Sequence, residues 1–128
     1  MPSIRLTMPM VAILSGLAMA PTAPAAAHEE PSGGEISEET MNDGAEQFMV
    51  NCRQCHGTTG TAGVPLKENA KLEDASYVVD TILVGPGYMT GFAEHLGDAE
   101  VAAIATYIRN SWGNDYGPVT PDEVAGAR

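Results

Sequence analysis

Large side chains are scarce in this chain of 128 residues, which has only two Phe, one Trp and four Tyr. A chain of this length holds one small domain. So few bulky groups fill the interior of such a domain poorly. The shortage predicts that a bound group, such as a cofactor, supplies part of the apolar volume.

Basic residues are also few: six Lys and Arg stand against 17 Asp and Glu, which gives a formal net charge of −11. Nucleic acids and anionic lipids are bound through basic surfaces, so this balance argues against both as partners. Two interpretations remain open. The acidity favours long-range attraction to a basic protein, or it only keeps an exported protein soluble.

Long hydrophobic runs are missing as well. The longest apolar stretch, from Met10 to Ala20, has eleven residues, whereas a membrane-spanning helix needs roughly 18 or more. Arg5 precedes this stretch and small residues end at Ala27, a pattern typical of a secretory signal. A permanent membrane anchor is the alternative. We therefore expect a cleavable signal peptide over 1–27 and export to the periplasm.

The remaining chain divides into two parts by composition. Residues 28–39 are rich in Glu and contain Gly, Pro and Ser, which predicts a flexible acidic lead segment. Residues 40–128 then form the single folded domain.

Only two cysteines are present, Cys52 and Cys55, and both lie in the pattern Cys-Arg-Gln-Cys-His that ends at His56. An exported pair of cysteines ordinarily forms a disulfide, but this pattern is typical of haem attachment. Helix positions i, i+3 and i+4 share one face, so two thiols can reach the vinyl groups of a haem while the imidazole reaches its iron. The motif predicts one covalently bound haem c, with His56 as an iron ligand.

Two other uses of the motif are a structural zinc site and a redox dithiol. A structural zinc site needs four ligands, and the chain offers no second paired cluster of Cys or His. A thioredoxin-like dithiol needs a βαβ surround, whereas the flanking residues have helical spacing. Both alternatives are disfavoured.

The second iron ligand is predicted to be Met89. Met41 and Met49 precede the motif in an apolar helical stripe, which indicates that they belong to the core. Met89 instead lies in the glycine-rich stretch 85–92, where the backbone can approach a haem closely. His95 is the alternative ligand. Ligation by His56 and Met89 occupies both faces of the iron, which favours an electron carrier over a catalyst.

Apolar spacing and capping residues predict three main helices and a short final turn. We expect them over 37–52, 74–84, 98–112 and 120–123, with Gly113 stopping the third.

Several further residues are candidates for the surroundings of the haem. The carbonyl of Pro65 is expected to accept the second N–H of His56; an ordinary turn proline is the alternative. Gly44 interrupts the first helix at a cost of up to about 1 kcal/mol. It predicts a close crossing with the last helix beside Tyr107, unless it is a tolerated surface glycine. Phe48 and Trp112 are predicted to pack in the core or at the haem edge.

Together these residues resemble the class I c-type cytochromes. The attachment motif comes early and the methionine loop follows, whereas relatives of cytochrome c′ have the motif near the end. The ending Ser-Trp-Gly-Asn at 111–114 is similar to cytochrome subunits that take electrons from periplasmic dehydrogenases. Such subunits often read Met-Pro-x-Phe at the distal loop, and this chain departs from that pattern at Thr90.

The resemblance implies an all-α fold with three main helices and short turns around one haem c. It also implies a single-electron carrier, free or as the haem subunit of a dehydrogenase, and not itself an enzyme. Its donor would be a periplasmic dehydrogenase and its acceptor a terminal oxidase or another redox protein. A haem enzyme or gas-binding protein with a displaceable sixth ligand is the alternative function.

Overall fold

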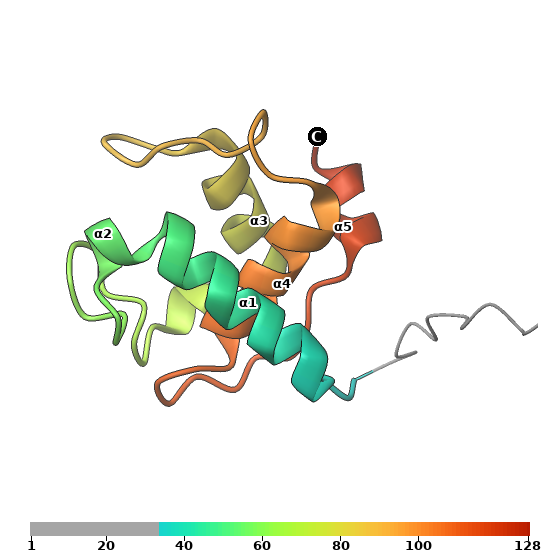
Figure 1. The fold of residues 1–128 in the computed structure, drawn as a ribbon, viewed down its shortest axis with the longest axis horizontal. Helices are drawn as coiled ribbons and strands as arrows, with labels where there is room; N and C mark the ends of the chain where they lie inside the picture. The colour runs from blue at the N-terminus through green and yellow to red at the C-terminus, as the bar shows by residue number, and fades with distance from the viewer. Residues whose placement is uncertain (1–33) are drawn as a thin grey trace, which may run out of the picture.

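The computed structural model describes residues 34–128, and every regular element in this range is helical (Figure 1). The elements are α1 (Glu38–Asn51), α2 (Arg53–His56), the 3-10 turn η1 (Ala70–Glu73), α3 (Ala75–Val84), α4 (Asp98–Arg109) and α5 (Pro121–Gly126). The all-α prediction is confirmed. The expected signal peptide lies outside the described residues. In the part of the chain that the structure describes, no helix is both long and apolar enough to cross a membrane.

Three helices begin where the sequence predicts. Ser37, Asp74 and Thr120 each accept a hydrogen bond from the backbone N–H three residues later, at 3.0, 3.1 and 3.3 Å. At α5 the carboxylate of Glu123 also accepts from the N–H of Thr120 at 2.7 Å, which completes a capping box. These caps satisfy N–H groups that have no partner within a helix.

Helix α4 ends earlier than predicted. It stops at Arg109 with Asn110 as its cap, not at Trp112 and Gly113. The amide of Asn110 donates to the carbonyl of Thr106 at 2.7 Å and its oxygen accepts from a later backbone N–H, so the side chain terminates the helix. Trp112 then adopts φ 54°, outside the helical range.

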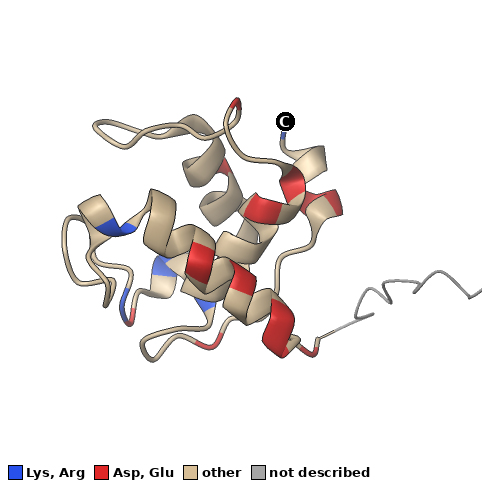
Figure 2. Ribbon diagram, viewed as in Figure 1, with Lys and Arg blue, Asp and Glu red and all other residues tan. Residues whose placement is uncertain are grey.

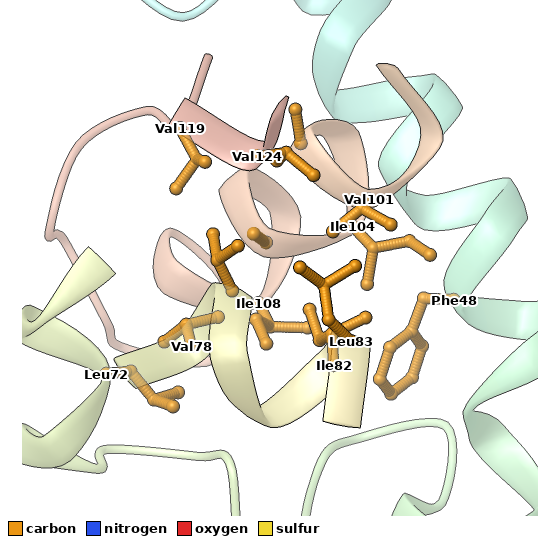
Figure 3. Close-up of a cluster of buried hydrophobic side chains, with 13 residues drawn as sticks. Phe48, Leu72, Val78, Ile82, Leu83, Val101, Ile104, Ile108, Val119 and Val124 are labelled. Atoms are coloured by element: carbon orange, nitrogen blue, oxygen red, sulfur yellow. The ribbon is translucent and has the colours of Figure 1, made fainter. Parts of the chain in front are cut away.

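The core forms around α4, which contacts α1, α3, α5 and η1. Phe48 comes from α1, Val124 from α5 and Leu72 from η1, and all three side chains are buried (Figure 3). Burial of these apolar groups is the main favourable term in folding. The two predicted long helices α1 and α4 therefore form the frame on which the shorter elements pack.

The crossing of α1 and α4 depends on Gly44. A Cβ atom at this position would lie 2.2 Å from the carbonyl oxygen of Ala103 and 2.6 Å from Cβ of Tyr107. Both distances are far below a van der Waals contact, so only glycine fits. The predicted close crossing beside Tyr107 is confirmed.

Arg109 was not expected to matter, yet it joins three parts of the fold. Its side chain is 5% exposed and makes five hydrogen bonds to carbonyl oxygens, at 2.7 to 3.0 Å. The acceptors are Leu72, Glu73, Tyr116, Gly117 and Pro118. Burial lowers the pKa of Arg109, an effect opposed by the charges of Glu123 and Asp74. The guanidinium fixes η1 and the 116–118 segment to the end of α4.

Candidate functional site

The two cysteines and His56 lie on one helical turn, as the motif predicts. Cys52 caps α1, its N–H donating to the carbonyl of Phe48 at 2.9 Å. The carbonyl of Cys52 then accepts from the N–H groups of Cys55 and His56, at 3.1 and 3.0 Å. This compact turn places both thiols and the imidazole together at the end of α1.

Neither thiol is engaged in a disulfide, and the two differ in exposure. Cys55 is exposed, whereas Cys52 is half-buried against the core. Burial, followed by the charge of Cys55, raises the pKa of Cys52 to about 11. Cys52 is therefore a protonated thiol at neutral pH.

The imidazole of His56 is held by the carbonyl of Val64, not by that of Pro65. Nδ1 of His56 lies 3.1 Å from the Val64 oxygen, while the Pro65 oxygen accepts from the amide of Asn69 at 2.7 Å. Gly63, directly before Val64, has φ 59°, and after this left-handed turn the carbonyl that meets the ring is that of Val64, one residue earlier than expected.

This contact also settles which ring nitrogen is available. A carbonyl oxygen only accepts hydrogen bonds, so Nδ1 of His56 carries the proton. The lone pair of Nε2 is then free to bind a metal ion. The sequence identified the donor and the need for an acceptor, but it missed Val64.

Met89 lies in a loop that turns back on the end of α3. A Cβ at Gly85, φ 67°, would fall 2.2 Å from the N of Gly91, and a Cβ at Gly91 would fall 2.6 Å from the carbonyl oxygen of Val84. Both positions therefore require glycine. The side chain of Met89 is half-buried and packs against the core, whereas His95 is exposed.

Helix α2 and the loop after α3 extend toward the same side of the molecule, at the left of Figure 1. The thiols, the imidazole and the thioether are thus carried by elements on one side. Within residues 34–128, no group of three or more His, Cys, Asp or Glu side chains forms a candidate metal site.

The predicted aromatic neighbours form one cluster behind the motif. Phe48 is fully buried, and its ring centroid lies 5.6 Å from that of Tyr107 and 5.1 Å from that of Trp112. Tyr107 and Trp112 are themselves 5.4 Å apart, edge to face. Such pairs add to the stability gained by burial. Phe48 belongs to the core, Tyr107 lies against Gly44 of α1, and Trp112 contacts Gly60 in the loop after His56.

The available donors fit a covalently attached haem. Two thiols and an imidazole on one turn match the attachment motif, and a half-buried thioether stands on a loop whose glycines allow close backbone approach. Because Nδ1 of His56 carries the proton, Nε2 is unprotonated and could bind a haem iron. These residues supply every protein group that ligation by His and Met requires.

Comparison with known proteins agrees with this chemistry. Residues 39–108 match the family described as cytochrome C oxidase, cbb3-type, subunit III. The chain is also similar to the cytochrome c subunit of a quinone alcohol dehydrogenase from Gluconobacter oxydans (strain 621H), with 33% identity over 92 residues. That match covers 58% of this chain and 19% of the relative, so the chain spans about a fifth of the relative's length. This chain belongs to the family described as cytochrome C oxidase, cbb3-type, subunit III, and is a class I c-type cytochrome.

Proposed function

We propose that this chain is an exported electron carrier with a single haem, attached through Cys52 and Cys55 and ligated by His56 and Met89. Haem-based electron transfer is the function that the family supports. The observation that carries the finer proposal is the single turn at Cys52–His56, with Nδ1 of His56 bonded to a carbonyl. A bound haem supplies a one-electron redox centre there.

The residues of the chain set the properties of that centre. The carbonyl of Val64 fixes the orientation of the His56 ring and increases its basicity. The thioether of Met89 is a softer ligand that favours the reduced state and raises the potential. With both ligands held by packed elements, the geometry changes little when an electron arrives or leaves, which suits a carrier.

A dehydrogenase is the proposed electron donor. The relative from Gluconobacter oxydans is by name the cytochrome c subunit of an alcohol dehydrogenase, and this supports a similar partner here. A terminal oxidase or another redox protein is the proposed acceptor. The many Asp and Glu side chains favour a partner with a basic docking surface.

An optical spectrum tests the proposed ligands. We expect the oxidised protein, produced in a strain that attaches c-type haem, to be low-spin and to show the weak methionine-to-iron charge-transfer band. Met89→Ala should remove this band, because the thioether would be lost from the iron. Met41→Ala is the matched control and should keep it, since Met41 is a half-buried residue of α1.

The other outcome identifies the alternative function. A wild-type spectrum that is high-spin and shifts on addition of carbon monoxide would mean an open iron. The protein would then be a gas-binding protein or a haem enzyme, and Met89→Ala would change little.

Export is tested on the same preparation. We propose cleavage of residues 1–27, supported by the short apolar run and the small residues before His28. Cell fractionation should place the haem protein in the periplasm, and N-terminal sequencing should begin at His28. An unprocessed chain in the membrane fraction would instead indicate a retained anchor.

A further inference from the structure

We infer that residues 111–114, the clamp segment, position the iron ligand His56 by fixing residues 57–69, the histidine loop. The inference rests on the proposed role of His56. The clamp segment directly follows α4, so it connects the histidine loop to the central helix. Three separate contacts join the two segments.

The first contact is between Trp112 and Gly60. A Cβ at Gly60 would lie 2.6 Å from Cε3 and 2.7 Å from Cζ3 of the indole ring, so the ring lies directly on the backbone of Gly60. Gly60 is buried and has φ 64°, a conformation that glycine adopts without strain. The backbone of the loop cannot move toward α4 without meeting the ring.

The second contact is made by Asn114, whose side chain is 5% exposed. Its amide nitrogen donates to the carbonyl of Leu66 at 2.8 Å, and its oxygen accepts from the N–H of Asn69 at 3.1 Å. The same nitrogen donates to the carbonyl of Ile108 in α4, also at 2.8 Å. One side chain thus fastens the end of the histidine loop to the helix.

The third contact is between Glu68 and Gly113, the residue after Trp112. Glu68 has φ 47° and Trp112 has φ 54°, the only non-glycine residues with positive φ in the described range 34–128. A Cβ at Gly113 would lie 3.1 Å from Cγ of Glu68, so the two segments touch at this point as well. Backbone strain of this kind persists only where the surroundings enforce it, and it tends to occur at functional sites.

Backbone hydrogen bonds within the histidine loop link these contacts to His56. The carbonyl of Gly60 accepts from the N–H groups of Leu66 and Lys67, at 2.8 and 3.0 Å, which closes the loop around Val64. The N–H of Ala62 donates to the carbonyl of His56 at 3.0 Å. Gly60 and Leu66, which contact the clamp segment, therefore lie before and after Val64, whose carbonyl accepts from the imidazole.

This arrangement predicts an effect on the redox potential. Loss of the indole ring would loosen the loop and weaken the hydrogen bond from Nδ1 of His56 to Val64. The imidazole would become a poorer electron donor, and the oxidised iron would be less well stabilised. The midpoint potential should then shift upward.

The test compares Trp112→Ala and Trp112→Phe with Val124→Ala in the haem-loaded protein. Val124 is fully buried in α5 and serves as a destabilising control, since it is not part of the clamp segment or the histidine loop. We expect Trp112→Ala to raise the midpoint potential, and Trp112→Phe to raise it less, because it keeps an aromatic ring beside Phe48. Val124→Ala should lower the stability and leave the potential unchanged.

Hydrogen exchange supplies a second readout. The amides of Ala62, Leu66 and Lys67 should exchange faster in both Trp112 variants than in Val124→Ala. If Trp112→Ala fails to mature, the comparison between Trp112→Phe and Val124→Ala decides the matter. Unchanged potential and exchange in Trp112→Phe, or equal changes in Val124→Ala, would overturn the inference.

Failure of the proposed function looks different. It would show in the wild-type protein, as absence of covalent haem or as an open iron. A normal wild-type spectrum combined with unresponsive Trp112 variants refutes only the role of the clamp segment.

Discussion

A single hydrogen atom, the side chain of Gly44, determines how closely α1 and α4 approach. The nearest atoms to a Cβ at this position belong to the backbone of Ala103 and to Cβ of Tyr107, and neither can swing away. We therefore expect Gly44→Ala to lower the free energy of unfolding by about 1–3 kcal/mol, as overpacking does. Urea unfolding of the haem protein measures this loss.

Gly126→Ala is the control for this substitution. Gly126 is the last residue of α5, and a Cβ there would meet nothing within 4 Å. The free energy of unfolding should change little in Gly126→Ala. Equal effects at the two positions would mean that the crossing tolerates a methyl group.

The thiols of Cys52 and Cys55 should differ in reactivity before haem is attached. Thiolate is the reactive form, and burial raises the pKa of Cys52 from 9.0 to about 11. At about pH 8, iodoacetamide should therefore modify the exposed Cys55 first. Mass spectrometry of peptides from the haem-free chain reports the order. Equal rates would mean that Cys52 is not buried in the haem-free chain.

The same pKa shift has a consequence for stability. A thiol whose pKa is raised in the folded state favours folding below its unfolded value of 9.0. This contribution is lost as the pH rises from 9.0 toward 11, because the unfolded chain ionises first. The haem-free protein should lose stability across that interval, and Cys52→Ser should reduce the loss.

Among the elements, η1 and the 116–118 segment depend on one side chain, Arg109. Lysine is a point charge and cannot reproduce the planar fork that meets five carbonyls. We expect Arg109→Lys to cost roughly 2–4 kcal/mol, because buried carbonyls lose charged hydrogen bonds. Thermal unfolding measures the effect. Arg53→Lys, at an exposed position of α2, should be nearly neutral; a comparable loss there would refute the special role of Arg109.

Helix starts could be predicted from the sequence because their caps are local. Ser37, Asp74 and Thr120 bind N–H groups only three residues away. The end of α4 could not be predicted in this way. Asn110 forms hydrogen bonds with a residue seven positions later, in a segment with no regular structure.

In the functional site, too, local contacts could be predicted from the sequence and contacts between distant residues could not. Cys52, Cys55 and His56 are placed by one turn, and that turn was predicted correctly. The acceptor for His56 was missed because it depends on the backbone at Gly63, where φ is positive. The five acceptors of Arg109 are all backbone carbonyls. Every residue has such a carbonyl, so the amino-acid sequence does not indicate which ones accept.

Charge is distributed unevenly over the whole molecule. Figure 2 shows acidic residues along α1 and on α4 and α5, while α2 carries the basic Arg53. Residues 47–67, which include both attachment cysteines, contain no Asp or Glu. The acidic surface is therefore largely separate from the attachment motif.

This distribution predicts how salt affects the encounter with a redox partner. Electron transfer to a small basic protein should slow as the ionic strength rises, because the attraction is screened. Stopped-flow kinetics at increasing salt measure the slope, with an uncharged oxidant as the control. Glu38→Gln together with Glu39→Gln should flatten the slope. A rate that is constant in salt for the wild type would exclude electrostatic attraction.

Acidic side chains lie on α1, α4 and α5, whereas residues 47–67 around the attachment motif have none, so the charge of the surface differs from one part of the molecule to another. Such a body turns in the field of a charged surface before it touches that surface. A basic partner is therefore attracted first toward the acidic helices.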